Sequence, residues 1–250
     1  MKENIPLMEH ERIDDLLTQD LKIIQSDKVF SFSMDAVLLG RFCSVPIRGN
    51  ILDLCSGNGV IPLLLSTRTK AQITAVEIQK KLADMAARNI KMNDLSDQIS
   101  IIQADLKLVH TQLGYGGFDL VTVNPPYLPA YSGKQNENEF IANARHEILC
   151  TLEDVISACN KLVKSGGKVG LVHRASRLAD IIVLMRQYNI EPKRIRFVHP
   201  RIGEEANMVL VEGIRNGKAD MHILDPLIVY DDHNQYCNEL MEIYYGDAAK

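Results

Sequence analysis

Short apolar runs rich in β-branched residues alternate along most of the chain with longer segments whose apolar residues recur every three or four positions. The runs predict buried strands, and the periodic segments predict amphipathic helices. The strands fall at 51–55, 73–76, 99–102, 118–123 and 168–172; the helices begin near Val60, at Gln79 and at Thr151, and a fourth spans 175–188. This alternation predicts an α/β fold with one doubly wound, mainly parallel sheet.

The two ends of the chain depart from this alternation. Residues 1–20 form a charged lead-in with a short amphipathic stretch at 13–17, and 21–30 predict a small hairpin around Ser26 and Asp27. Ser33 holds the N-cap position of a short helix over 34–42. The runs at 194–198 and 208–211 predict an antiparallel pair, which brings the sheet to seven strands. A run at 227–230 and a helix at 238–245 close the chain.

Two further segments carry clear local signals. Residues 128–146 are polar without an apolar period and predict a long functional loop. Thr151 to Asp154 resemble a capping box, and the helix that follows is expected to end at Ser165-Gly166-Gly167. We therefore expect an N-terminal extension at 1–48, a main domain at 49–215 and a tail at 216–250 that packs on the same domain.

The four residues Asn124-Pro125-Pro126-Tyr127 follow directly on the apolar run 118–123. Prolines have a fixed φ and no N–H, so a strand that ends this way presents rigid carbonyl acceptors. Together with the Asn124 amide and the Tyr127 ring, these carbonyls suit an exocyclic amine on a flat ring. Asn-Pro dipeptides also mark ordinary turns after strands. The tetrapeptide alone therefore leaves both interpretations open.

A glycine-rich turn, Ser56-Gly57-Asn58-Gly59, follows the first strand of the alternation. Its glycines let the backbone approach a ligand, and the next helix presents free N–H groups. Glu77 ends the following strand 18 residues after Gly59, near the separation at which a carboxylate binds a ribose diol in nucleotide-binding folds. Asp105, just past the third strand, can accept a hydrogen bond from an adenine amine or can cap the next helix.

A dinucleotide-binding dehydrogenase is the alternative within this fold class. Its G-x-G-x-x-G fingerprint needs a third glycine at position 62, where this chain has Pro62. Nothing in the tetrapeptide at 124–127 serves hydride transfer. The motifs together therefore favour chemistry on an amine.

Composition and cysteine usage narrow the class of protein. Hydrophobic residues make up 46% of the chain and charged residues 24%, as in soluble globular proteins, and no apolar run is long enough to span a bilayer. The five cysteines are scattered without a C-x-x-C pair, and the seven histidines lack metal-ligand spacing. We therefore expect a cytoplasmic protein without membrane contact, disulfides or a structural metal.

The net charge of −4 conceals an uneven distribution. Residues 161–218 contain 12 Lys and Arg against 5 Asp and Glu, a net of +7, which leaves −11 for the rest of the chain. A basic segment in an acidic protein is typical of a nucleic-acid partner, although solvated helix faces also account for such charges.

In this order, Asp53-x-Cys55-x-Gly57-x-Gly59, Glu77, Asp105 and Asn124-Pro125-Pro126-Tyr127 make the chain resemble the class I S-adenosylmethionine-dependent methyltransferases that act on amino groups, over roughly residues 30–215. Cys55 departs from the family pattern, which often has a glycine there. The resemblance implies a Rossmann-like methyltransferase domain with two groups of site residues. The catalytic group is Asn124, Pro125 and Tyr127. The residues that bind S-adenosyl-L-methionine are Asp53, Cys55, Gly57, Asn58, Gly59, Glu77, Asp105, Leu106 and Asn124.

The resemblance also implies individual roles. Gly57 and Gly59 pass beside the methionine part of the cofactor, Glu77 binds the ribose and Asp105 the adenine, while Asp53 orients the loop or meets the cofactor's amino group. The Asn124 side-chain oxygen and the Pro125 carbonyl accept the two N–H bonds of the substrate amine, and this draws its nitrogen toward tetrahedral geometry. Tyr127 stacks on the extruded base that carries the amine.

The flanking segments 32–40, 144–147 and 225–230 are similar to bacterial tRNA adenine-N6 methyltransferases that act beside the anticodon of a valine tRNA. The resemblance implies tRNA as partner, with phosphate contacts from the basic segment 161–218. Enzymes that methylate guanine in ribosomal RNA or the glutamine amide of a release factor carry the same tetrapeptide, so both substrates stay open. A non-catalytic RNA-binding module is disfavoured because the tetrapeptide is intact.

Overall fold

The computed structural model describes residues 5–26, 34–127 and 150–245, and within them a nine-stranded sheet forms the centre of the molecule. The strand order is β10-β8-β9-β7-β6-β3-β4-β5, and β11 also pairs with β8. The strands are β3 (Asn50–Leu54), β4 (Gln72–Glu77), β5 (Ile99–Gln103), β6 (Phe118–Val123), β7 (Val163–Arg174), β8 (Ile190–His199), β9 (Met208–Arg215), β10 (His222–Ile223) and β11 (Leu227–Ile228).

Only β9 runs antiparallel to its neighbours in this sheet, β7 and β8, and every other pairing is parallel. The predicted α/β class, the mainly parallel sheet and the late antiparallel pair are therefore confirmed. The seven expected strands are β3 to β9. The sequence did not predict β10, whose two residues form no apolar run, and it extended the run at β11 by two residues.

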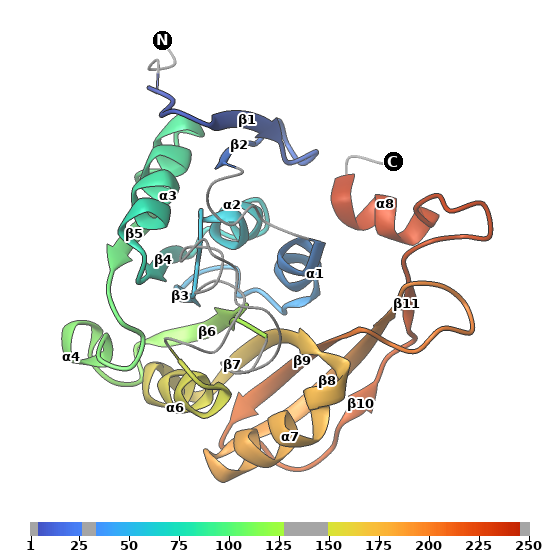
Figure 1. Cartoon of the computed structure of the whole chain (residues 1–250). Helices are drawn as coiled ribbons and strands as arrows, with labels where there is room; N and C mark the ends of the chain where they lie inside the picture. The colour runs from blue at the N-terminus through green and yellow to red at the C-terminus, as the bar shows by residue number, and fades with distance from the viewer. Residues whose placement is uncertain (1–4, 27–33, 128–149, 246–250) are drawn as a thin grey trace.

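Helices cover both faces of the sheet (Figure 1). Three lie on one face: α1 (Met34–Phe42), α2 (Val60–Ser66) and α3 (Lys80–Met92). On the other face lie α4 (His110–Leu113), α6 (Leu152–Leu162) and α7 (Leu178–Gln187), the last preceded by the 3-10 turn η1 (Ala175–Arg177). Consecutive residues of β3 supply the two cores in turn, because Ile51 packs in one cluster and Leu52 in the other. The closing helix, α8 (Asn238–Tyr245), has the expected bounds and packs beside α1.

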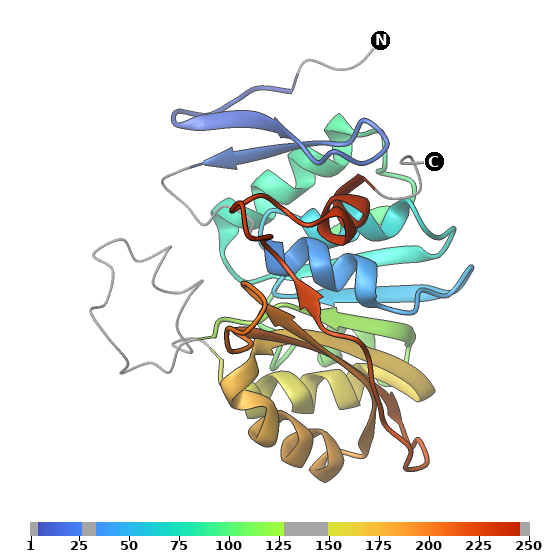
Figure 2. The ribbon, with the colours of Figure 1, turned by 90° about the vertical axis from the view of Figure 1, so that its right-hand side faces the viewer.

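The N-terminal hairpin differs from its prediction. It pairs β1 (Glu11–Asp15) with β2 (Lys22–Ser26), so its first strand lies in the segment expected to be a lead-in. The β1 residues are mostly exposed and polar, so no apolar alternation marks them as a strand. The hairpin lies over α3 (Figure 2). Ile23 and Ile24 of β2 are fully buried. The predicted partner 28–30, the N-cap Ser33 and the loop 128–146 lie outside the described residues.

The capping box at the start of α6 is confirmed, since Thr151 and Asp154 bond reciprocally. The predicted end of that helix is wrong: α6 ends at Leu162, and Ser165, Gly166 and Gly167 belong to β7. A Cβ on Gly167 would lie 3.1 Å from the Phe118 carbonyl oxygen and 2.8 Å from a Val163 methyl. This glycine therefore permits close strand packing, a role that a sequence pattern does not separate from a helix C-cap.

Asn89 of α3 joins the hairpin to the turn after β3. Its Oδ1 accepts the Ile24 N–H at 2.6 Å, and its Nδ2 donates to the Asn58 carbonyl at 2.9 Å. The side chain is fully buried, so each bond replaces one that water cannot supply.

We expect Asn89→Ala to lower the free energy of unfolding by about 1–3 kcal/mol, because it leaves a buried backbone donor and acceptor without partners. Denaturant unfolding measures this loss. Asn93→Ala is the matched control: Asn93 is the C-cap residue directly after α3, four positions beyond Asn89, and makes the corresponding bonds to Lys22 (2.9 and 2.7 Å), but at the exposed surface. Equal losses for the two variants would contradict the importance of burial at Asn89.

Candidate active site

A pocket opens at the carboxyl ends of β3, β4, β5 and β6, where ligands bind in sheets of this class. It holds about 860 Å³ of space, including its open mouth. Of the residues proposed from sequence, those that line it are Cys55, Gly57, Asn58, Glu77, Asp105, Leu106 and Asn124. Ser56 and Pro126, which belong to the two motifs singled out in the sequence, line it as well. Sequence reasoning missed the other lining residues, which are Ala36, Val60, Ile61, Val76, Ile78, Gln79, Leu82, Ala104 and Cys150.

The glycine-rich turn forms one wall of this pocket. Gly57 has a φ of 57°, and a Cβ built on it would meet no atom within 4 Å, so this glycine leaves space beside the pocket. Gly59 is different: its φ is 87°, a Cβ there would lie 3.2 Å from Ala86 of α3, and it does not line the pocket. Its glycine therefore serves helix packing.

Cys55 also has a left-handed backbone, with a φ of 56°. That conformation favours glycine, which accounts for the glycine that related sequences often have at this position. A hydrogen bond with Cys150 and burial raise the pKa of the Cys55 thiol well above its usual range. Both residues line the pocket, so the thiol group contributes a neutral wall.

Glu77 lies at the end of β4 with both carboxylate oxygens engaged. One accepts the Gly57 N–H and the other the Gln79 N–H, each at 2.8 Å. Burial raises the pKa of Glu77, and these N–H groups oppose the rise. Each carboxylate oxygen can accept a second hydrogen bond. Glu77 therefore retains acceptors for a ligand with two hydroxyls.

Asp53 lies in β3 and does not line the pocket. It is fully buried, and its Oδ1 accepts the Thr122 hydroxyl at 2.6 Å. Asp53 Oδ2 and the hydroxyl of Ser56 make no well-aligned hydrogen bond among the described residues, but the Ser56 hydroxyl, like that of Thr122, is close enough to Asp53 to lower its pKa. Burial raises the pKa of Asp53 to about 7, and the nearby Glu77 charge adds to the rise.

Two other predicted residues combine a place in the pocket wall with a local structural bond. Asp105 Oδ1 accepts the Lys107 N–H at 2.9 Å and so caps the turn after β5. Asn58 Nδ2 donates to the Ile24 carbonyl at 3.2 Å, and the Asn58 side chain is buried. Asp105 therefore lines the pocket and caps this turn, and its role as an acceptor for an adenine amine stays a prediction.

The tetrapeptide continues the pocket from β6. Asn124 and Pro126 line it, Pro125 is buried between them, and Tyr127 lies beside the lining residues. The Tyr127 hydroxyl is within hydrogen-bonding distance of Asn124 Oδ1, at 2.5 Å, and of Asp35 Oδ2. Burial and the Asp35 charge raise the pKa of the Tyr127 phenol well above its usual range.

Two residues of β7 complete the surroundings of Tyr127. The His173 and Tyr127 ring centroids are 5.1 Å apart, and the Arg174 guanidinium lies 6.0 Å from the Tyr127 ring. His173 Nδ1 accepts the Arg174 N–H at 2.9 Å, so its proton is on Nε2, which has no partner among the described residues. Burial lowers the pKa of His173 to about 4. The imidazole is therefore neutral at physiological pH.

Asp35 and His173, which contact Tyr127, are two further site residues that sequence reasoning did not find. A carboxylate in the first turn of a strongly apolar helix was the available signal for Asp35, since such a group needs a partner when buried. His173 had only its position at the end of a strand. Neither signal identifies Tyr127 as the partner.

The fold and the pocket define a Rossmann-like methyltransferase. A family model described as "methyltransferase small domain" matches residues 20–177, and the chain belongs to that family. The resemblance drawn from the motifs is thereby confirmed.

Named relatives and solved structures agree with this assignment. A tRNA1(Val) (adenine(37)-N6)-methyltransferase of Aeromonas hydrophila is 30% identical over 71% of this chain and 73% of its own length. One from Haemophilus influenzae is 29% identical over 88% of this chain and 92% of its own. A crystal structure titled as a predicted O-methyltransferase from Agrobacterium tumefaciens has a TM-score of 0.68 and 25% identity, covering 86% of this chain and 98% of that one.

We expect Gly57→Ala to weaken binding of the pocket's ligand at least tenfold, because its Cβ would enter space beside the pocket and strain a left-handed backbone. Isothermal titration with S-adenosylhomocysteine measures the affinity. Gly166→Ala is the matched control, since Gly166 has a φ of 77° and an equally open surrounding but lies at the start of β7, away from the pocket. Comparable weakening by both variants would mean that backbone strain alone is responsible.

In the ligand-free protein, Asp53 should reduce stability as the pH rises from about 4 to about 7. The pKa of Asp53 is about 7 when folded and 3.8 ordinarily, so over this interval the folded state holds a proton that the unfolded state has released. His173 acts in the opposite direction, because its pKa is lowered to about 4 from an ordinary 6.5 and its contribution to stability therefore grows over about the same interval. Asp53→Asn removes only the first effect, so the stability of the variant relative to the wild-type protein should increase with rising pH, as followed by thermal unfolding. Glu77, whose pKa is also raised, leaves a remaining slope. An unchanged profile in the variant would show that Asp53 is ionised throughout.

Proposed function

We propose that this protein transfers a methyl group from S-adenosyl-L-methionine to the exocyclic N6 amine of an adenine in tRNA, next to the anticodon of a valine tRNA. The observation that carries the proposal is the position of Asn124 and Pro126 in the wall of the pocket that also holds Gly57 and Glu77. An amine-binding tetrapeptide and a nucleoside-binding pocket thus share one cavity.

The described residues fit the cofactor. Glu77 has acceptor capacity for the ribose hydroxyls, Gly57 leaves space that suits the methionine portion, and Asp105 and Leu106 line the same pocket, where we assign the adenine. The Ser56 hydroxyl lines the pocket as well, and we assign the amino-acid portion of the cofactor to its side. When bound, S-adenosyl-L-methionine supplies an electrophilic methyl group. Apart from Asn58, Gln79 and Asn124, the rest of the lining is apolar, as is usual for cofactor sites.

The chain's part in the reaction is to position the amine and strengthen its nucleophilic character. An aromatic amine is a poor nucleophile because its lone pair is delocalised into the ring. Acceptance of its N–H bonds by Asn124 Oδ1 and the Pro125 carbonyl favours a tetrahedral nitrogen with a localised lone pair. This is catalysis by positioning and electrostatics. His173 is a weak base, because its pKa is lowered to about 4 and its Nδ1 already accepts the Arg174 N–H, and the raised pKa of Tyr127 keeps that phenol protonated.

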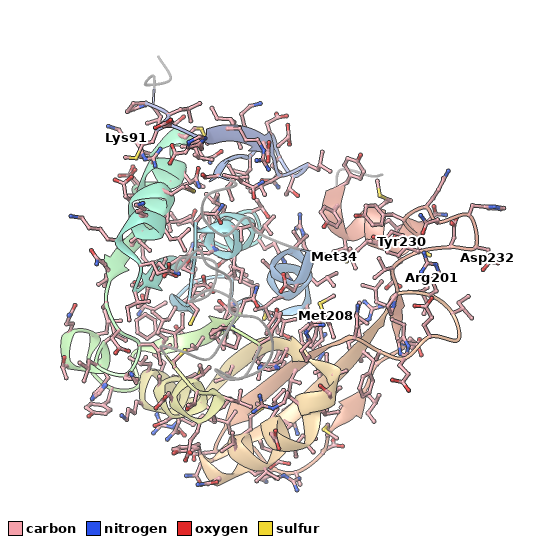
Figure 3. The ribbon with its side chains drawn as sticks, viewed as in Figure 1. Met34, Lys91, Arg201, Met208, Tyr230 and Asp232 are labelled. Carbon is pink, nitrogen blue, oxygen red and sulfur yellow. The ribbon has the colours of Figure 1, made fainter. Side chains whose placement is uncertain are left out.

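tRNA as substrate is supported by the names of the relatives and by the charge of the site edge. The basic segment 161–218 is not one patch, because many of its cations pair with carboxylates: Lys164 with Asp119, Arg177 with Asp180, Arg186 with Glu191, Arg194 with Glu212, Arg196 with Glu239, and Arg201 with Glu204. Arg201 also lies over Tyr230 (Figure 3). Arg174, exposed beside the Tyr127 ring, is placed to contact phosphate next to the target base.

Among the described helices, none combines the length and the apolar character needed to cross a membrane. A tRNA substrate also fits the cytoplasmic location expected from the cysteines.

The proposal is tested by incubating the protein with methyl-labelled cofactor and, separately, bulk tRNA, ribosomal RNA and release factors, followed by nucleoside mass analysis. We expect label in N6-methyladenosine from tRNA. Label confined to ribosomal guanine or to protein would overturn the proposal. We expect Asn124→Ala to lower kcat at least a hundredfold, because the residue acts on the amine, and kcat is measured at saturating cofactor because Asn124 also lines the pocket. Full activity in this variant would contradict the role of Asn124.

A further inference from the structure

Tyr127 presents one hydroxyl proton to two acceptors. Its oxygen lies 2.5 Å from Asn124 Oδ1 and is also hydrogen-bonded to Asp35 Oδ2. A phenol has a single O–H donor, so the two acceptors compete for it. One of them is the atom that the substrate amine requires under the proposed function.

Asp35 is the stronger of the two acceptors for the Tyr127 hydroxyl proton. It lies in the first turn of α1, only 5% exposed, and its Oδ1 accepts the Ala36 N–H at 2.9 Å. This bond fixes the carboxylate so that Oδ2 is the oxygen offered to Tyr127. A charged acceptor makes a markedly stronger hydrogen bond than a neutral amide oxygen. Burial keeps the phenol protonated, since it raises the pKa of Tyr127.

The outcome matters for Asn124. While the Tyr127 proton is held by Asp35, Asn124 Oδ1 is available to accept an N–H from the incoming amine. If residue 35 offered no charged acceptor, the phenol would donate its proton to Asn124 Oδ1 and occupy that oxygen. The same bond also holds the Tyr127 ring between α1 and His173 of β7.

We propose that Asp35 is a positioning residue for methyl transfer. It accepts the hydroxyl proton of Tyr127, so that this proton is not donated to Asn124 Oδ1 and that oxygen stays available for the substrate amine. The inference rests on the proposed function. It extends the reactive tetrapeptide to a residue 92 positions earlier in the chain.

The test is a double-mutant comparison of Asp35→Asn, Tyr127→Phe and the combined variant, with the wild-type protein methylating tRNA as reference. We expect Asp35→Asn to lower kcat at least tenfold with little change in the KM for tRNA or in cofactor affinity. Tyr127→Phe should cost less, because it removes the competing hydroxyl. The combined variant should recover to the level of Tyr127→Phe, because no hydroxyl is left to occupy Asn124.

Two measurements separate this role from a merely structural one. The side-chain amide signals of Asn124 in NMR spectra of the cofactor-free protein should shift in Asp35→Asn and shift back in the combined variant. If Asp35→Asn folds poorly, Asp35→Ala with and without Tyr127→Phe provides a stronger contrast, since asparagine keeps a neutral amide acceptor and alanine offers none.

The outcomes are distinct. Wild-type activity in Asp35→Asn, or a combined variant no more active than Asp35→Asn alone, would overturn the inference and leave the proposed function standing. A wild-type protein that places no label on adenine would instead overturn the proposed function itself.

Discussion

The parallel pairing of β3 with its two neighbours is the constraint on which the site depends. Leu54 lies opposite Val76 of β4 and Val123 of β6. The residues that follow these three positions therefore emerge at the same edge of the sheet, although they come from distant parts of the sequence. They are Cys55, Glu77 and Asn124. A shift of one residue in either register would turn one of these side chains to the opposite face. Such a shift would be costly, because both strands bury apolar side chains in the packed cores on the two faces of the sheet.

Burial of carboxylates at this edge opposes stability and prepares the site for a ligand. Asp53 and Glu77 both have raised pKa values because the fold removes them from water. The protein offsets part of this cost with the Thr122 hydroxyl and with the N–H groups of Gly57 and Gln79. Asp53 Oδ2 receives no such bond from the described residues. A positively charged group bound nearby would supply the missing interaction, so ligand binding and the ionisation of these acids are coupled.

Elements marked by a local signal could be predicted from sequence, and features made by contact between distant residues could not. The strands β3 to β6 and helix α3 follow from periodicity alone, and the capping box of α6 follows from Thr151 and Asp154. β1 was not predicted because its mostly exposed residues show no alternation of apolar and polar side chains. The glycines show the same limit inside the site: Gly57 and Gly59 look alike in sequence, yet one leaves space beside the pocket and the other packs on Ala86. The basic segment 161–218 is weaker evidence for a nucleic-acid surface than its charge count suggests, because carboxylates from outside the segment, such as Asp119 and Glu239, pair with its cations.

The N-terminal extension takes part in the site, and this changes how the chain divides. Ala36 lines the pocket, Asp35 bonds Tyr127, and the Ile24 carbonyl accepts from Asn58 in the glycine-rich turn. Leu38 and Leu39 of α1 are buried in the same core as Ile51 of β3. A boundary near residue 48 is therefore visible as a change of pattern in the sequence, but the packing crosses it. The family match begins at residue 20 and so includes β2 and α1. This start agrees with the contacts, because a domain that began at β3 would lack one wall of its own pocket.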